Sequence, residues 1–203
     1  MEKTSGNREK ILRCAMEMFH QKGYASTSVD DLLRECGVAK SNFYYHFRTK
    51  DDLALASLEA YHQAHKIKST ALLTDPSKTP LSRLSLYFEG AIQAQTQAVK
   101  AGCPFGNFAS SLICETQLST SEREKQQRFR QALTQVFTQM EMEISSCLRE
   151  GRACGEIRDD LSEDALALLT LATLQGLMVL AKVKEDRRFL VEGLIALRKI
   201  LAK

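Results

Sequence analysis

The chain has 203 residues, of which 44% are hydrophobic and 26% charged, a composition that supports a buried core and argues against disorder. Its three prolines leave long stretches without the strongest helix breaker, which favours an all-α fold. The formal net charge is +3, and residues 1–50 hold all of this excess, with nine Lys or Arg against six Asp or Glu. Any bound polyanion is therefore expected at the N-terminal part.

The first fifty residues predict three helices. Residues 8–22 place apolar side chains on one helical face, and Gly23 follows as a stop signal. Ser28 lies three residues before an acid, a pattern that caps a second helix running to about Cys36. Gly37 allows a sharp turn into a third helix. In that helix two phenylalanines four residues apart face one way, and polar and aromatic side chains occupy the other faces.

Apolar periodicity predicts further helices over residues 51–73, about 81–100, 121–150, 165–181 and 187–202. The sequence GCPFGNF interrupts the pattern after the second of these, and GRACGEIRDD forms a linker after the third. Residues 165–181 carry no charge, and this length borders on that of a membrane span. The pattern agrees better with a helix buried on both sides, against its own core and against a partner subunit.

The motifs of metal sites and enzymes are missing from the sequence. The six cysteines include no C-x-x-C pair, and most of them are interpreted as small buried apolar residues. The charged N-terminus has no apolar signal-peptide region, so a reducing, cytoplasmic compartment is expected. His62 and His65 share one helix face, interpreted as solvated surface. No catalytic set, metal ligand group or cofactor site is predicted.

A helix, a glycine turn and a short polar helix together can place one helix in a DNA major groove, although many helical proteins contain such a pair. The segment REKILRCAMEMFHQKGYASTSVDDLLRECGVAKSNFYYHFRTKDDL closely resembles the N-terminal domain of the tetracycline-repressor (TetR) family of bacterial regulators. GEIRDDLSED resembles the family's link into its penultimate helix. The resemblance implies a three-helix helix-turn-helix DNA-binding domain over residues 1–50 and a larger helical ligand-sensing and dimerisation domain over residues 51–203.

The resemblance also implies which side chains meet DNA. Candidates for contacts to base edges or their surroundings are Lys40, Ser41, Asn42, Tyr45 and His46. Candidates for phosphate contacts are Thr27, Tyr44 and Lys50. Their chemistry agrees, because lysine and asparagine donate to base edges and tyrosine hydroxyls suit phosphate oxygens. Packing between helices is the alternative for both tyrosines. The family often has serine where this chain has Ala39, so the third helix lacks a good cap.

By the same resemblance, residues 161–202 are expected to form a homodimer, and a small-molecule effector is expected to release the protein from a pseudo-palindromic operator. Aromatic residues on the segments that would surround an effector are Tyr61, Tyr87, Phe88, Phe105, Phe108 and Phe129, with core packing as the alternative. Cys103 lies beside a predicted helix start, which lowers a thiol pKa. It is either a sensor of electrophiles or oxidants, as in some relatives, or a structural residue.

Overall fold

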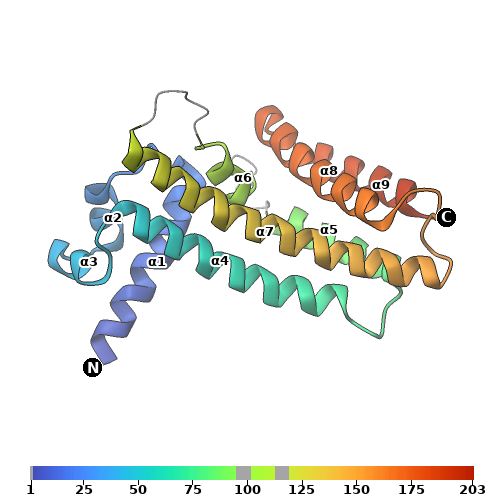
Figure 1. Cartoon of the computed structure of the whole chain (residues 1–203), viewed down its shortest axis with the longest axis horizontal. Coiled ribbons are helices and arrows are strands. Elements are labelled where there is room, and N and C mark those ends of the chain that lie inside the picture. The colour runs from blue at the N-terminus through green and yellow to red at the C-terminus, as the bar shows by residue number, and fades with distance from the viewer. Residues whose placement is uncertain (1, 95–101, 113–118) are drawn as a thin grey trace. The chain divides into compact units, whose positions relative to one another are not determined.

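The computed structural model describes residues 2–94, 102–112 and 119–203, and its described part is all-α, as predicted (Figure 1). Only an isolated antiparallel bridge between Ile157 and Ala202 adds strand pairing to these residues. The helices are α1 (Glu2–Lys22), α2 (Val29–Cys36), α3 (Lys40–His46), α4 (Lys50–Leu73), α5 (Pro80–Ala94), α6 (Pro104–Ala109), α7 (Thr120–Ala153), α8 (Glu163–Lys184) and α9 (Arg188–Leu201).

Several helix bounds differ from those predicted; helix α1, for example, begins at Glu2 instead of residue 8. Helix α5 is described as far as Ala94, and residues 95–100 of the predicted helix lie outside the described residues. The interruption GCPFGNF contains the short helix α6. Helix α7 continues past Gly151, near which the sequence predicted its end, to Ala153. Gly151 does not end the helix; it lets Ile157 pack closely against the backbone. A Cβ on Gly151 would lie 2.4 Å from Ile157 Cγ1, so only glycine allows this approach.

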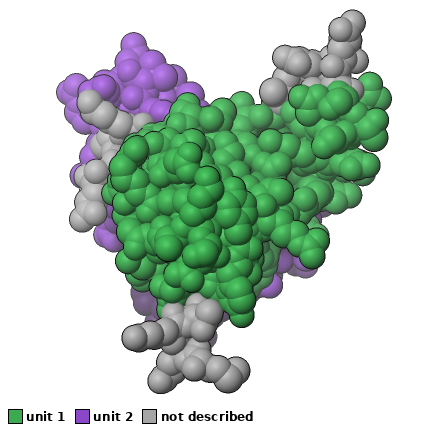
Figure 2. All heavy atoms as spheres, turned by 90° about the vertical axis from the view of Figure 1, so that its left-hand side faces the viewer, with its two compact units in different colours: residues 1–63, 104–135 green, residues 64–103, 136–203 purple. Residues whose placement is uncertain are grey.

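The chain forms two compact units, shown in different colours in Figure 2. Unit 1 comprises Met1–Gln63 and Pro104–Gln135, and unit 2 comprises Ala64–Cys103 and Val136–Lys203. Helices α4 and α7 contribute to both units. The division at residue 50 into DNA-binding and sensing domains is a functional prediction, and these units neither follow nor test it.

In unit 1, helices α2, α3 and α6 pack against α1. Helix α2 starts with the predicted cap: Ser28 Oγ accepts from the Asp31 backbone N–H at 3.1 Å, and the Asp31 carboxylate accepts from the Ser28 N–H at 3.2 Å. The helix ends at Gly37, whose left-handed backbone (φ 59°) turns the chain towards α3. Phe43 and Phe47 are buried, as their spacing predicts. These local signals orient α3.

In unit 2, α9 packs against α5 and α8 (Figure 1). The buried Arg83 holds the loop between α4 and α5, because its guanidinium donates to the carbonyl of Asp75 at 2.7 Å and to Glu150 Oε2 at 2.6 Å. Helix α8 has apolar residues on two faces. One face is buried, and the other stays exposed with Leu168, Val179 and Val183.

The cysteines agree in part with the prediction that most are buried. Cys36, Cys103 and Cys147 are buried, Cys14 is half-buried, and Cys154 is exposed. Cys114 lies outside the described residues. Cys154 is exposed because it follows the end of α7 in the linker to α8, which covers little of it.

Candidate nucleic-acid interface

Helix α3 exposes one face and buries the other. Phe43 is fully buried and holds the helix against unit 1, whereas Tyr44 and Tyr45 are 50% and 74% exposed. Lys40 and Ser41 are exposed, and Asn42 is half-buried. The predicted DNA-facing residues of α3 therefore lie together on a helix whose other side is anchored in a core. Exposure on this scale leaves their donors available to base edges and phosphates.

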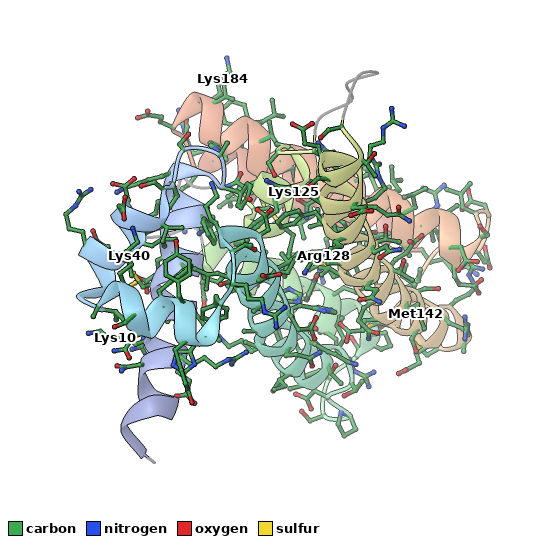
Figure 3. The ribbon with its side chains drawn as sticks, turned by 60° about the vertical axis from the view of Figure 1, so that its left-hand side comes forward. Lys10, Lys40, Lys125, Arg128, Met142 and Lys184 are labelled. Atoms are coloured by element: carbon green, nitrogen blue, oxygen red, sulfur yellow. The ribbon has the colours of Figure 1, made fainter. Side chains whose placement is uncertain are left out.

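Lys40, the cation on the exposed face of α3, makes only a weak ion pair within the protein. Lys40 Nζ lies 3.7 Å from Asp30 Oδ1, and both side chains are well exposed (Figure 3 labels Lys40). Such a surface pair contributes little stability, so a DNA phosphate or base can replace the carboxylate. His46 is less accessible: its ring meets Tyr45 edge-on at 4.9 Å between centroids, and its buried Nε2 has no hydrogen-bond partner in the described residues.

Thr27 and Lys50 have structural roles that the sequence did not indicate. Thr27 is 1% exposed, and its hydroxyl donates to the Gly23 carbonyl at 2.8 Å. Lys50 Nζ donates to the carbonyls of Tyr24 at 3.1 Å and Thr27 at 3.0 Å. Burial, followed by the charge of Lys125, lowers the pKa of Lys50. The predicted phosphate contacts of these two residues remain predictions, and replacing either will also disturb the turn between α1 and α2.

The start of α3 lacks a side-chain cap, as the sequence predicts. Ala39 occupies the N-cap position with an extended backbone (φ −66°, ψ 146°), which suits a capping serine. We expect Ala39→Ser to raise the free energy of unfolding by about 1 kcal/mol. Urea denaturation at fixed protein concentration measures this. Ala39→Val, which adds no acceptor, is the control, and an equal gain from both would show that capping is not the cause.

Tyr24, which follows α1, joins this helix to α4, α6 and α7, a role that the sequence did not indicate. Its hydroxyl donates to the Asp51 carboxylate, and Lys125 Nζ lies 3.1 Å from the same carboxylate oxygen (Figure 3 labels Lys125). Its ring lies 5.3 Å from Phe129 and 6.1 Å from Phe108 between centroids. Burial, followed by the hydrogen bond to Asp51, raises the pKa of Tyr24. These partners lie far apart in sequence, so no local pattern could reveal them.

Four of the predicted effector-facing aromatic residues belong to unit 1, where they pack in clusters. Phe108 and Phe129 stack at 6.2 Å, and Phe108 also meets Phe19 of α1 at 5.7 Å. Tyr61 and Phe105 form a separate pair at 5.2 Å. The first cluster links α6 and α7 to α1, so Phe108 and Phe129 have a packing role whether or not an effector touches them.

The other two aromatic residues, Tyr87 and Phe88, belong to unit 2, as does the separate sensing candidate Cys103, and all three are buried. Burial, followed by the charges of Glu143 and Cys103, raises the pKa of Tyr87. Glu143 Oε2 in turn accepts from Ser69 Oγ at 2.6 Å. Tyr87 therefore lies close enough to an acidic side chain to feel its charge, and an effector role for these three residues stays a prediction.

The anchored α3 with its exposed polar and aromatic face is the arrangement of a helix-turn-helix DNA-binding protein. Residues 11–57 match the family model described as bacterial regulatory proteins, tetR family, and residues 80–197 match the tetracyclin repressor-like C-terminal domain. The chain belongs to the tetR family of bacterial transcriptional regulators. Members of this family bind DNA operators as dimers with small-molecule effectors, are generally non-enzymatic and are normally cytoplasmic.

Relatives support this over most of the chain. The transcriptional regulator AcuR of Cereibacter sphaeroides is 30% identical over 177 residues, which cover 87% of this chain and 76% of that protein. The HTH-type transcriptional repressor DhaR of Mycobacterium sp. is 28% identical over 180 residues, covering 89% and 84%. A crystal structure of regulatory protein TetR from Rhodobacter sphaeroides has a TM-score of 0.84 at 28% identity and covers 95% of this chain and 97% of that one.

Proposed function

We propose that the protein is a cytoplasmic repressor that binds a pseudo-palindromic operator as a homodimer and is released by a small-molecule effector. The observation that carries the proposal is the exposed face of α3, where Lys40, Ser41 and Tyr45 project from a helix anchored by Phe43. Two such helices in a symmetric dimer read two half-sites one helical turn of DNA, or a multiple of it, apart.

Salt-dependent titration tests the role of α3. We expect Lys40→Ala to weaken DNA binding and to reduce the slope of log affinity against log salt by about 1, because one cation no longer displaces a counterion. Arg149→Ala is the matched control, since it removes an exposed cation from α7 in unit 2. Equal effects of the two variants would contradict the proposed interface.

The homodimer is supported by the second apolar face of the C-terminal helices. Leu168, Val179 and Val183 of α8 are 59%, 59% and 72% exposed, and Ile195 of α9 is 53% exposed. Helix α8 is long and apolar enough to cross a bilayer, but a single helix of this kind is only weak evidence for a membrane span. A partner subunit covering α8 and α9 explains the same face and agrees with dimeric binding in this family.

Two buried polar atoms in unit 1 support an effector site near α4. Ser57 Oγ and His62 Nε2 have no hydrogen-bond partner in the described residues, although both side chains are at least 92% buried. The sequence interpretation of His62 as solvated surface is wrong, because Phe105 of α6 meets its ring edge-on at 6.4 Å. Unpaired buried polar atoms carry a free-energy cost that a ligand oxygen would remove. We therefore favour an effector with an apolar body and a hydrogen-bonding oxygen.

Helix α6 offers a path from such an effector to the DNA-binding helices. Asn107 Nδ2 donates to the His20 carbonyl of α1 at 3.0 Å. We expect Asn107→Ala to keep DNA affinity within about threefold and to reduce effector-induced release by about tenfold, because coupling between sites is typically 1–3 kcal/mol. Release of bound DNA by a panel of small carboxylic acids, aldehydes and phenols measures this. Undiminished release with the variant would exclude this path.

Cys103 gives a second candidate function, a thiol sensor of electrophiles or oxidants. The position of Cys103 favours this role, because Cys103 directly precedes the N-terminus of α6. Its side chain is only 8% exposed, so a reagent needs local opening to reach it. Mass spectrometry after mild electrophile treatment, beside DNA binding of Cys103→Ser, tests this role. An unlabelled thiol or an unchanged response in the variant would end it.

A further inference from the structure

Two thiols meet where α1 packs against α2. Cys14 is half-buried on α1, and Cys36, the last residue of α2, is 4% exposed. Helices α1 and α2 pack against each other, and the two thiols are close enough to interact. The position of Lys10 agrees with this packing, because Lys10 precedes Cys14 by one helical turn and so lies on the same face of α1. Lys10 Nζ lies 4.0 Å from the position of a Cβ on Gly37, the residue after Cys36 (Figure 3 labels Lys10).

The environments of the two thiols differ. Burial, followed by the interaction with Cys14, raises the pKa of Cys36, and the charge of Lys10 opposes this shift. Cys36 is therefore held as a buried thiol, whereas the more exposed Cys14 is the one that a dissolved oxidant reaches first. Cys147 and Cys154 differ from this pair, because their thiols donate to backbone carbonyls.

We propose that Cys14 and Cys36 form a disulfide when the protein meets a hydroperoxide, and that this bond lowers DNA affinity. The Cys14 thiolate attacks the peroxide, whose O–O bond breaks, and a sulfenic acid forms as the alcohol or water leaves. The Cys36 sulfur then attacks the Cys14 sulfur, the S–S bond forms, and the hydroxyl departs with the Cys36 proton as water. Two thiols are oxidised and one hydroperoxide is reduced.

The effect on DNA affinity rests on the proposed function and on the position of Cys36. Gly37 follows it with a left-handed backbone, and α3 begins three residues later. An S–S bond of about 2.05 Å is shorter than the contact between two unbonded thiols. Bond formation therefore draws the end of α2 towards α1 and shifts the turn that orients α3.

Peptide mapping of the full chain tests the disulfide. Reduced protein is treated with hydrogen peroxide, digested without reductant and analysed by mass spectrometry, and its affinity for DNA selected from a random pool is measured before and after. We expect a cross-linked Cys14–Cys36 peptide and an affinity loss of about tenfold or more, reversed by dithiothreitol. Cys36→Ala and Cys14→Ser should show neither, and Cys154→Ser, which removes an exposed thiol, should behave as wild type.

The outcomes separate the two proposals. Wild-type protein without the cross-linked peptide contradicts the disulfide, and a cross-link that leaves affinity unchanged contradicts its regulatory effect. The peptide map does not depend on DNA, so failure of the reduced protein to bind any selected DNA contradicts the proposed function instead. Using two cysteine variants keeps the test valid if the buried Cys36→Ala alone fails to fold.

Discussion

Val179→Glu is expected to convert the dimer into monomers and to weaken operator binding by about 100-fold or more, since linked half-site binding is lost. Val179 is 59% exposed in the monomer, on the unpartnered apolar face of α8. A partner subunit covering this face would take the introduced carboxylate out of water, which opposes association. Size-exclusion chromatography with light scattering measures the mass, and titration at constant salt measures the affinity.

The matched control is Met142→Glu on α7, labelled in Figure 3. Met142 is 61% exposed, close to the value for Val179, and lies on a helix outside the proposed dimer face. The control should stay dimeric with wild-type affinity, because its carboxylate remains in water. A dimeric Val179→Glu protein with unchanged DNA affinity would show that α8 does not form the interface.

Tyr24→Ala is expected to lower the free energy of unfolding by about 3–5 kcal/mol, the usual cost of truncating a large buried aromatic side chain. The variant loses the ring contacts to Phe19, Phe108 and Phe129 and the hydrogen bond to Asp51. The variant also loses the cation–π contact of Lys50, whose Nζ lies 4.2 Å from the centroid of the Tyr24 ring. Urea denaturation measures the loss.

Tyr45→Ala is the control, because the same truncation is made at a side chain that is 74% exposed. It should change stability by less than about 0.5 kcal/mol, as surface substitutions usually do. It should nevertheless weaken DNA binding, since Tyr45 lies on the proposed reading face. Equal losses of stability in the two variants would contradict the distinct roles of the two tyrosines.

The sequence predicted the DNA-binding helices well because their signals are local. Ser28 and Asp31 cap α2 within four residues, Gly37 forms the left-handed turn, and Phe43 and Phe47 share one helical face. Each of these features depends on the backbone of a few neighbouring residues, which makes it readable without the rest of the fold.

The inward orientation of Thr27 and Lys50 could not be predicted in this way. Lys50 donates to two carbonyls of the segment between α1 and α2, and this geometry exists only after α4 has packed there. The hydroxyl of Thr27 bonds locally to the Gly23 carbonyl, but the burial of its side chain depends on the folded unit. The same holds for the contact of Asn107 with His20, which joins segments 87 residues apart. Such tertiary contacts leave no periodicity in the sequence.

Selection of DNA from a random pool by the full-length protein tests the central claim, that a dimer reads DNA through α3, most directly. We expect enriched sites to contain two inverted half-sites with centres about 10 base pairs or a multiple apart. Selection with Asn42→Ala should change the preferred bases within each half-site. Enriched sites without two-fold symmetry, or sites that Asn42→Ala leaves unchanged, would contradict the claim.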